Sequence, residues 1–342
     1  MKAVRVHEYN QPPSLDDIPE PGIEGPFDVL VKIDAAGVCR TDLHIIEGQW
    51  AEKSGVGLPY VIGHENAGTV VATGDAVRGV ADGDRVILHP LVTCGLCRAC
   101  RSGDDVHCSD SEFPGINRDG GMAELLRTSV RSVVKLDEGL HPADVAALAD
   151  AGLTAYHAVR KAAPQLHPGD HVVQIGVGGL GHIGLQCLLA MTAARVTVVD
   201  MSTEVLEKAK TLGAHTTVVS DGSQVDQIMD LTKGEGAQIV IDFVGEHGTE
   251  ADGVAMTKNA GSYFVIGYGG NVDIPTIDII SREINVIGNL VGSYNDLVDL
   301  MRLAATGDVT LSTKQYDLDD ALRALDDLDG GRVPGGRAIL TT

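Results

Sequence analysis

The sequence has no apolar run long enough to cross a membrane, for which about 18 or more residues are needed. Its first residues, MKAVRVHEYN, also lack the apolar centre of a signal peptide. We therefore expect a cytoplasmic protein that has no membrane partner.

Cationic side chains are scarce as well. The chain has 26 Lys and Arg residues against 48 Asp and Glu residues, and its formal net charge is −22. Nucleic-acid binding needs a cationic surface, so the composition argues against a nucleic-acid partner. Of the acids 33 are Asp, and only 10 of the cations are Lys. Such a surface repels itself in dilute buffer and is screened at molar salt, which favours a salt-loving host. An acidic protein from a GC-rich bacterial genome is the alternative.

A chain of 342 residues is long enough for two domains. Residues 1–150 contain short β-branched runs such as KAVRV, DVLVKI, AGTVVATG and DRVILHP, separated by Gly, Pro and Asp. Helical periodicity is scarce before residue 142. This pattern predicts a β-rich unit of the barrel or sandwich kind.

Four of the six cysteines follow the spacing Cys94-x2-Cys97-x2-Cys100-x7-Cys108. Thiols this close together can surround one tetrahedral metal ion, whereas paired disulfides would be strained. We predict a closed, structural zinc site. A Cys₄ iron–sulfur cluster and a zinc ribbon of a nucleic-acid-binding protein are the alternatives, and the acidic composition argues against the second.

Residues 170–181, DHVVQIGVGGLG, run from a β-branched strand into a turn with glycines at 176, 178, 179 and 181. A helical apolar pattern follows, and then a second strand that ends in Asp200. This is the context in which a glycine-rich turn binds the pyrophosphate of a dinucleotide at a helix N-terminus. Asp200 can accept a hydrogen bond from the ribose 2′-OH and would repel a 2′-phosphate, so NAD⁺ is favoured over NADP⁺.

Strands and helices continue to alternate beyond this turn. Strands are expected at 216–220, 237–243, 262–267 and 284–290, and helices at 202–212 and 223–232. Such alternation predicts a parallel sheet that is covered on both faces. Two amphipathic helices are expected closer to the C-terminus, at 297–309 and 319–328.

Residues 37–65 bring together side chains with several chemical uses. They contain Cys39, Asp42, His44, His64 and Glu65. Thiolate, imidazole and carboxylate are the ligand types of Zn²⁺, and they can also relay a proton. On their own, these residues could equally be unrelated short motifs, with His64 a hydrogen-bonded core histidine.

The motifs GVCRTDLH, GHE, the four-cysteine spacing, GVGGLG and the terminal Gly336–Arg337 occur in one order. With them the chain resembles, over essentially its whole length, the zinc-containing alcohol dehydrogenases of the medium-chain family, in their prokaryotic and archaeal form. The resemblance implies an α/β protein with two domains. A GroES-like β-rich catalytic domain would span 1–150, completed by 291–342, and a doubly wound Rossmann domain would span 151–290.

The resemblance also implies two zinc ions per chain. Cys39 and His64 would be ligands of a catalytic zinc, and Glu65 a fourth, exchangeable ligand. The family's third protein ligand falls here on Asp150, for which helix N-capping is the alternative. The structural zinc would be held by four cysteines: Cys94, Cys97, Cys100 and Cys108.

The remaining roles also come from the resemblance. Thr41 would take the proton of the alcohol, His44 would end the relay, and Asp42 would orient His64. Trp50 and Phe113 are candidates for walls of the substrate pocket, or for core aromatics. Contacts to NAD⁺ are expected at Arg40, Thr154, Gly176, Gly178, Gly179, Leu180, Gly181, Asp200, Gly267, Leu290, Val291 and Arg337.

The resemblance predicts reversible hydride transfer between a primary or secondary alcohol and NAD⁺. A polyol or sugar dehydrogenase, or an aldehyde reductase, of the same family is the alternative, with NAD⁺ or NADP⁺ as cofactor. A metal-dependent regulatory protein that binds nucleic acid would need a basic face, and zinc-free quinone reductases lack the cysteine motif and the GHE pair. By analogy with related enzymes we expect a homo-oligomer, specifically a tetramer.

Overall fold

The computed structural model of the chain describes residues 1–333 and 336–342. The chain forms two compact units. The first consists of Met1–Leu153 and Gly292–Thr342, and the second of Thr154–Val291. Both termini therefore belong to the first unit.

The first unit is built on a sheet with the strand order β10-β6-β5-β3-β18-β17, in which β9 also pairs with β3. Two smaller sheets have the orders β2-β1-β4 and β7-β8. The strands are β1 (Lys2–Val6), β2 (Ser14–Asp17), β3 (Asp28–Val38), β4 (Tyr60–Val61), β5 (Glu65–Thr73), β6 (Arg85–Leu88), β7 (Val92–Thr93), β8 (Ser111–Glu112), β9 (Leu125–Ser129), β10 (Val133–Lys135), β17 (Thr313–Asp317) and β18 (Arg337–Thr341).

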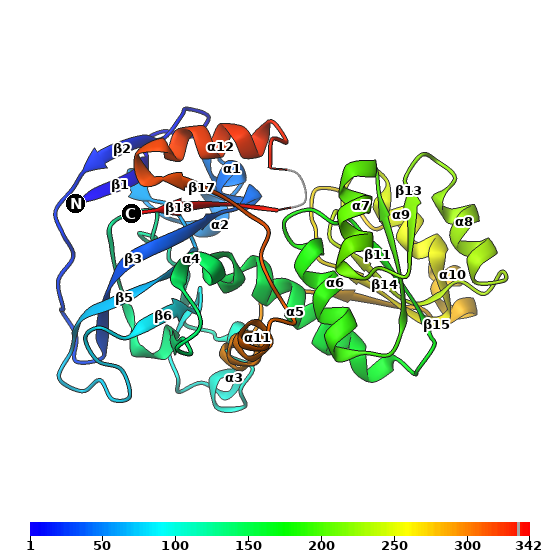
Figure 1. Cartoon of the computed structure of the whole chain (residues 1–342), viewed down its shortest axis with the longest axis horizontal. Coiled ribbons are helices and arrows are strands. Elements are labelled where there is room, and N and C mark those ends of the chain that lie inside the picture. The colour runs from blue at the N-terminus through cyan, green and yellow to red at the C-terminus, as the bar shows by residue number, and fades with distance from the viewer. Residues whose placement is uncertain (334–335) are drawn as a thin grey trace. The chain divides into compact units, whose positions relative to one another are not determined.

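Strand β3 lies at the centre of this unit. Alternate residues along it, Val29, Val31 and Ile33, are completely buried, as the period of two predicts for a strand with one face on the core. β5, β9 and β18 all pair with β3 in antiparallel fashion, with Ala338 opposite Val38. The C-terminal strand thus completes the sheet that the N-terminal residues begin (Figure 1).

Among its described residues, the first unit contains four short helices before residue 146 and two longer ones after residue 293. They are α1 (Arg40–Ile46), α2 (Ala51–Ser54), α3 (Arg98–Arg101), α4 (Pro142–Val145), α11 (Tyr294–Thr306) and α12 (Ala321–Asp329). Helix α1 was not expected from the sequence. A capping box between Cys39 and Asp42 starts it, and it buries only Asp42 and Ile45, so it has no long apolar stripe for sequence analysis to detect.

The second unit contains one sheet of parallel strands in the order β13-β12-β11-β14-β15-β16. Its strands are β11 (His171–Ile175), β12 (Arg195–Asp200), β13 (Thr216–Val219), β14 (Ala237–Asp242), β15 (Thr257–Val265) and β16 (Asn285–Gly288). Its helices are α6 (Gly181–Met191), α7 (Thr203–Leu212), α8 (Gln224–Leu231), α9 (Thr249–Met256) and α10 (Thr276–Arg282), and α5 (Ala151–Ala162) enters it from the first unit.

Helices cover both faces of the parallel sheet, with α6 and α7 on one side and α9 and α10 on the other (Figure 1). The strand order reverses beside β11, whose neighbours are β12 and β14. This is the doubly wound α/β arrangement, and ligands of such sheets bind at the carboxyl ends of the strands where the order reverses.

The expected strands of this unit are all present. Strand β15 starts at Thr257 rather than at 262, because Thr257 pairs with Ala237 before a register shift, in which residues 258–261 of β15 are extra, and the pairing resumes at Ser262 opposite Ile239. Among the described residues, no helix is both long enough and apolar enough to span a membrane.

Candidate active site

Four potential metal ligands meet in the first unit. One donor atom from each of Cys39, His64, Glu65 and Asp150 lies within 4.8 Å of the others. Cys39 follows β3 and caps α1, His64 and Glu65 stand at the start of β5, and Asp150 directly precedes α5. We call this group the mixed-donor cluster.

The donor set fits a zinc ion. Both ring nitrogens of His64 are buried and have no hydrogen-bond partner among the described residues, which is unusual for a core histidine and typical of a metal ligand. Nε2 of His64 lies 3.5 Å from Oδ2 of Asp150, and Nδ1 lies 3.3 Å from Oδ1 of Asp42. A thiolate, an imidazole and a carboxylate can hold Zn²⁺ and leave a fourth position for exchange.

The charges around His64 favour a cation in this cluster. Burial is the largest single effect and opposes the charged form of the imidazole, but Asp42, Asp150 and Cys39 together outweigh it, so the pKa of His64 is raised above its ordinary value. Metal ions and protons compete for the same nitrogen. The negative field that holds a proton on His64 would therefore also favour a bound Zn²⁺.

Glu65 already has strong partners. It is completely buried, and its Oε1 accepts a hydrogen bond from the backbone N–H of Ala151 at 3.1 Å. Its Oε2 accepts from the guanidinium of Arg337, whose side chain is only 4% exposed. Burial raises the pKa of Glu65, and the charge of Arg337 opposes that shift. Ligation of a metal by Glu65 would have to compete with Arg337, which suits an exchangeable role.

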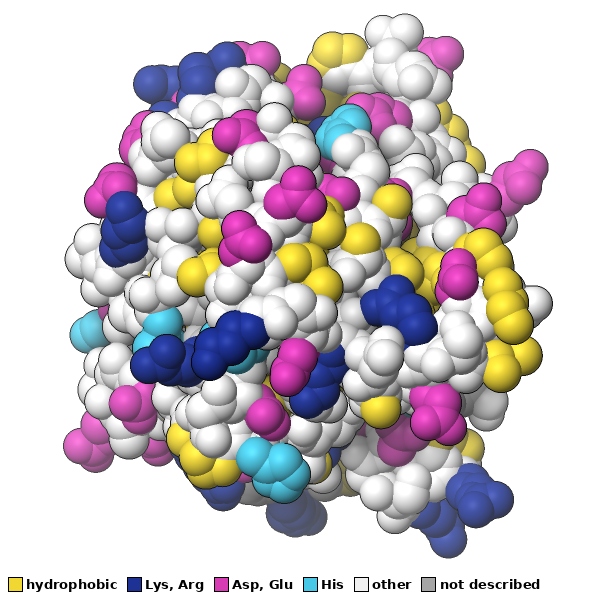
Figure 2. Space-filling view, turned by 90° about the vertical axis from the view of Figure 1, so that its right-hand side faces the viewer, with side chains coloured by type: hydrophobic (Ala, Val, Ile, Leu, Met, Phe, Trp, Pro, Cys, Tyr) yellow, Lys and Arg dark blue, Asp and Glu magenta, His cyan; other side chains and the backbone are white. Residues whose placement is uncertain are grey.

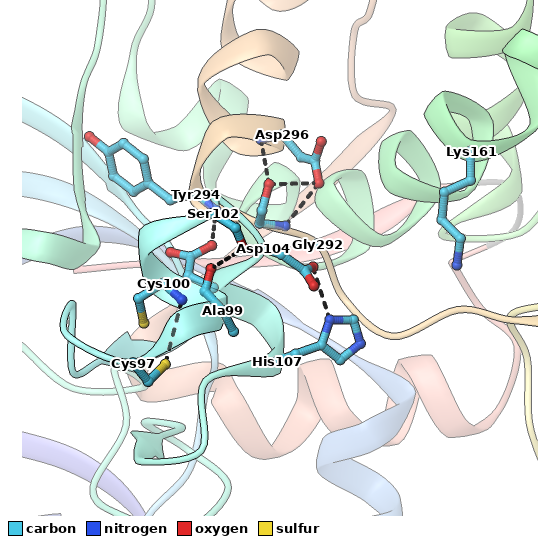
Figure 3. Close-up of polar contacts among 12 residues, drawn as sticks. Cys97, Ala99, Cys100, Ser102, Asp104, His107, Lys161, Gly292, Tyr294 and Asp296 are labelled. Carbon is cyan, nitrogen blue, oxygen red and sulfur yellow. Dashed lines mark hydrogen bonds and ion pairs between the residues drawn. The ribbon is translucent and has the colours of Figure 1, made fainter.

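The four clustered cysteines form a second donor group, the cysteine lobe (residues 94–108), whose sulfurs also lie within 4.8 Å of one another. Backbone N–H groups of the same loop donate to them. Leu96 and Cys97 donate to the sulfur of Cys94, and Cys100 donates to that of Cys97 (Figure 3). Such donors, from Cys100 and Ser109, lower the pKa of Cys97 to about 6. The loop thus favours the thiolate, the form that binds metal, at Cys94 and Cys97, whereas burial raises the pKa of Cys100 to about 12.

The glycine turn of the second unit lies between β11 and α6. Gly176 has a φ of +86°, which favours glycine, and a Cβ at Gly181 would lie 2.1 Å from the carbonyl oxygen of Gly176. A Cβ at Gly178 would meet nothing within 4 Å, and Gly178 is exposed. The backbone is therefore open to a ligand at the N-terminus of α6, as pyrophosphate binding requires.

Asp200 stands at the end of the next strand, β12. Its Oδ2 accepts a hydrogen bond from the N–H of Val177 at 2.9 Å, and its Oδ1 accepts from the N–H of Ser202 at 2.9 Å. The carboxylate is partly exposed and keeps further acceptor capacity. It can thus accept from a ribose hydroxyl while it also holds the glycine turn.

Comparison with known proteins gives this geometry a family. The family model of the alcohol dehydrogenase GroES-like domain matches residues 25–138, and that of zinc-binding dehydrogenases matches residues 179–306. An NAD-dependent alcohol dehydrogenase of Sulfurisphaera tokodaii is 36% identical over 99% of this chain and 100% of that protein. The chain belongs to the zinc-binding, medium-chain alcohol dehydrogenase family. The family and fold class inferred from the sequence are thereby confirmed.

Other members of the family show its range. The crystal structure of the alcohol dehydrogenase from the hyperthermophilic archaeon Aeropyrum pernix is 46% identical, with a TM-score of 0.96 and full coverage of both chains. A D-arabinose 1-dehydrogenase (NADP⁺) of Saccharolobus solfataricus is 35% identical over 99% of this chain and 97% of that protein. Proteins similar to this chain thus include enzymes named for alcohols and one named for a sugar.

Helix α1 carries four residues with predicted roles, Arg40, Thr41, Asp42 and His44. Arg40 is exposed, and Thr41 and His44 are half-buried. Asp42 is completely buried, and its Oδ2 accepts from the N–H of Cys39 at 2.8 Å. One carboxylate thus starts the helix and faces His64.

The two predicted pocket aromatics have different surroundings. Phe113 makes an edge contact with the ring of His64, with ring centroids 5.9 Å apart, so it lies beside the mixed-donor cluster. Trp50 packs against the core, and the ammonium of Lys53 lies 5.7 Å from its ring centroid. Phe113 is thus the better supported of the two as a wall of the site.

The predicted cofactor contacts outside the glycine turn are dispersed. In the second unit, the carbonyl oxygen of Thr154 accepts from Asn289, Leu290 is 56% exposed, and Val291 is buried with a φ of +43°. A Cβ at Gly267 would lie 2.2 Å from the carbonyl oxygen of Val244. Arg337, in the first unit, is buried beside Glu65, and its contact with a pyrophosphate stays a prediction.

Sequence analysis did not identify Asp242, at the end of β14. This completely buried carboxylate accepts from the N–H groups of Val244 and Gly245 and from the hydroxyl of Tyr263, at 2.8, 3.0 and 2.8 Å. It fixes the loop whose Val244 side chain would meet a Cβ at Gly176. The sequence feature that could have identified Asp242 is its position as an acidic residue at the carboxyl end of a buried parallel strand.

Proposed function

We propose that this protein is a zinc-dependent alcohol dehydrogenase that transfers a hydride reversibly between an alcohol and NAD⁺. The observation that carries the proposal is the buried imidazole of His64, which lies among Cys39, Glu65 and Asp150 and whose ring nitrogens make no hydrogen bond with another described residue. The glycine turn with Asp200 supplies a site for the hydride acceptor, and the names of several relatives support the same activity.

In this proposal residues 1–150 with 291–342 act as the catalytic domain, and residues 151–290 bind the dinucleotide. Cys39, His64 and Asp150 would hold the catalytic zinc, Glu65 would be the exchangeable ligand, and the cysteine lobe would hold the structural zinc. When bound, the catalytic zinc would act as a Lewis acid on the alcohol oxygen, and NAD⁺ would take the hydride.

The side chains of α1 handle the proton. The hydroxyl of Thr41 would accept the proton of the alcohol, and His44, half-buried on the same helix, would pass it on towards solvent. Asp42 holds the His64 ring in its orientation from the side opposite Asp150. Phe113 would keep water away from the same ring.

The decisive experiment is reduction of NAD⁺ and NADP⁺ by a panel of primary alcohols, secondary alcohols, polyols and aldoses. We expect NAD⁺ with simple alcohols to give the highest kcat/KM, because Asp200 repels a 2′-phosphate. Faster turnover of aldoses than of alcohols would favour a sugar dehydrogenase, and no turnover of any member of the panel would overturn the proposal.

The assignment of Asp150 needs its own test. Asp150→Ala should lower the zinc content of the purified protein from two ions per chain towards one, and Asp150→Cys should restore it. If the zinc content of Asp150→Ala is unchanged, Asp150 is not a zinc ligand, and its role is to cap helix α5.

We further propose that the protein works at high salt. Acidic side chains are spread over the face of the molecule shown in Figure 2, among basic and apolar groups, and the formal net charge is −22. Activity and melting temperature are expected to rise from dilute buffer to molar KCl, as charge repulsion is screened. Maximal stability in dilute buffer would contradict a salt-loving host.

A cytoplasmic homo-oligomer completes the proposal. None of the six cysteines forms a disulfide bond, which suits a reducing compartment. Strand β16 is an edge of the parallel sheet, and the nearby side chains of Ile277 and Ile280 are 66% and 70% exposed. An open edge beside exposed apolar groups suits association with a second copy. Light scattering in molar KCl should show an oligomer, expected to be a tetramer, that Ile277→Glu/Ile280→Glu weakens.

A further inference from the structure

Gln174 is a buried polar residue in β11, two residues before the first glycine of the turn. Its exposed fraction is 0%. Its Nε2 donates to the carbonyl oxygens of Gly176 and Gly181, at 3.0 and 2.8 Å, so one amide group bridges the two ends of the turn. The family match does not explain why a glutamine stands here.

Packing alone does not account for this amide. Its Oε1 is buried and has no hydrogen-bond partner among the described residues. A buried acceptor without a partner costs stability, and an apolar side chain of similar size would fill the same space without that cost. The two hydrogen bonds to the turn are the contribution of Gln174 that an apolar side chain could not make.

The bond from Gln174 to Gly176 links Gln174 indirectly to Asp200, through one peptide group. A peptide group is planar and trans, so its C=O and N–H point in opposite directions. The peptide between Gly176 and Val177 is held on both sides, because Gln174 donates to its oxygen and Asp200 accepts from its nitrogen at 2.9 Å. The direction of the Asp200 carboxylate therefore depends on the same peptide that Gln174 fixes.

The bond from Gln174 to Gly181 links Gln174 indirectly to Gly178, the exposed glycine of the turn. Gln174 donates to the oxygen of the peptide between Gly181 and His182. The N–H of that peptide donates to the oxygen of Gly178 at 3.2 Å, and Nδ1 of His182 lies 3.0 Å from the same oxygen. Gln174 thus fixes the turn directly at Gly176 and Gly181, and His182 extends that support to Gly178.

We propose that Gln174 is a positioning residue that sets the shape of the pyrophosphate-binding turn and the direction of Asp200, and so strengthens the binding of NAD⁺ and NADH. The inference rests on the proposed function, because it takes the turn to be the dinucleotide site. Gln174 is too deeply buried to touch the cofactor and acts only through the backbone.

The test compares Gln174→Met with the wild type, both as the full zinc-loaded chain. The dissociation constant of NADH is measured by fluorescence titration without alcohol, together with the melting temperature, kcat and the KM for NAD⁺. We expect the dissociation constant and this KM to rise about tenfold, kcat at saturating NAD⁺ to change less than about threefold, and the melting temperature to be unchanged or higher. An NADH dissociation constant within about twofold of the wild-type value would overturn the inference.

Gln224→Met is the matched control. Gln224 belongs to the same unit, is 8% exposed, and donates to Asp252 at 2.6 Å, while its Oε1 accepts from the N–H of Gly222, outside the glycine turn. This variant should lose stability and keep its affinity for NADH, the reverse of Gln174→Met. If the two variants change affinity and melting temperature in parallel, Gln174 has only a structural role.

Gln174→Glu tests the hydrogen bonds themselves. Burial and the two carbonyl oxygens raise the pKa of a carboxyl group at this position, so it stays neutral and donates one hydrogen bond where Gln174 donates two. The affinity of Gln174→Glu for NADH should therefore lie between those of the wild type and Gln174→Met. Affinity equal to that of the wild type would again overturn the inference. A wild-type protein that binds no NADH would overturn the proposed cofactor as well, whereas wild-type binding that Gln174→Met retains would overturn the inference alone.

Discussion

The first unit contains two groups of four potential metal ligands, and they are assembled in opposite ways. The cysteine lobe takes its four sulfurs from residues 94–108, whereas the mixed-donor cluster takes its ligands from residues 39, 64, 65 and 150. In the lobe, three of the four cysteines are partly exposed, and their sulfurs accept hydrogen bonds from nearby backbone N–H groups. In the cluster the donors are mostly buried and are held by charged side chains.

This difference separates a closed site from an exchangeable one. Four thiolates fill a tetrahedral shell, so the lobe has no position left for a substrate. In the cluster, Glu65 is already bound by Arg337 and by the N–H of Ala151, which leaves three donors for a metal and one position open. The lobe can form from one loop, but the cluster exists only after β3, β5 and α5 have come together.

The largest effect is expected from removing a donor of the mixed-donor cluster. Cys39→Ala or His64→Ala should lower kcat/KM at least about a thousandfold, because the Lewis acid supplies several kcal/mol of transition-state stabilisation. NADH affinity should be retained, and the zinc content should fall from two ions per chain to one. Turnover at the wild-type rate would remove the cluster from the mechanism.

A matched substitution in the lobe should act on stability instead. Cys97→Ser should also lower the zinc content by one ion per chain, but the free energy of unfolding should fall by several kcal/mol, because structural zinc contributes folding energy directly. The activity of the folded fraction, normalised to catalytic zinc, should stay within about threefold of the wild type. Thermal unfolding and metal analysis of the same samples provide both values. A Cys97→Ser protein that is stable but inactive would reverse the assignment of the two sites.

The same difference explains what the sequence could predict. The lobe and the glycine turn are local, so their spacing alone indicated a metal site and a dinucleotide site. The mixed-donor cluster is not local, and Asp150 came to attention only through the family resemblance. The pairing of Glu65 with Arg337 joins residues 272 positions apart, and no pattern in the sequence reports such a contact.

Helix α1 shows a second limit of sequence analysis. Its seven residues are too few for hydrophobic periodicity, and the cap that starts it uses Cys39, which is not a usual capping residue. Strand β15 shows a third, since its early start depends on a shift in its register with the neighbouring strand β14. In both cases tertiary contacts decide where the element begins.

The buried ion pair of Glu65 and Arg337 provides the next test, because the ion pair within the lobe, between Asp104 and His107, is exposed. Glu65→Gln leaves the guanidinium of Arg337 buried without its carboxylate, which should lower the free energy of unfolding by about 3 kcal/mol or more. The double variant Glu65→Gln/Arg337→Met removes both charges and should recover part of the loss. Denaturant unfolding of both proteins measures the difference, and a single variant as stable as the wild type would show that the pair does not stabilise the cluster.

The smallest effects are expected from replacing one carboxylate beside each of the two sites. Asp42 faces His64 at 3.3 Å, whereas Asp105, in the lobe, accepts from the N–H of Tyr294 at 3.0 Å. Asp42→Asn should keep the cap of α1 through its amide oxygen but lower kcat/KM about 10- to 100-fold, because His64 loses the charge that orients it. Asp105→Asn should cost about 1 kcal/mol of stability and leave kcat within about twofold of the wild type. Equal losses of kcat in the two variants would mean that the lobe takes part in catalysis after all, and the division into a closed structural site and an open catalytic one would fail.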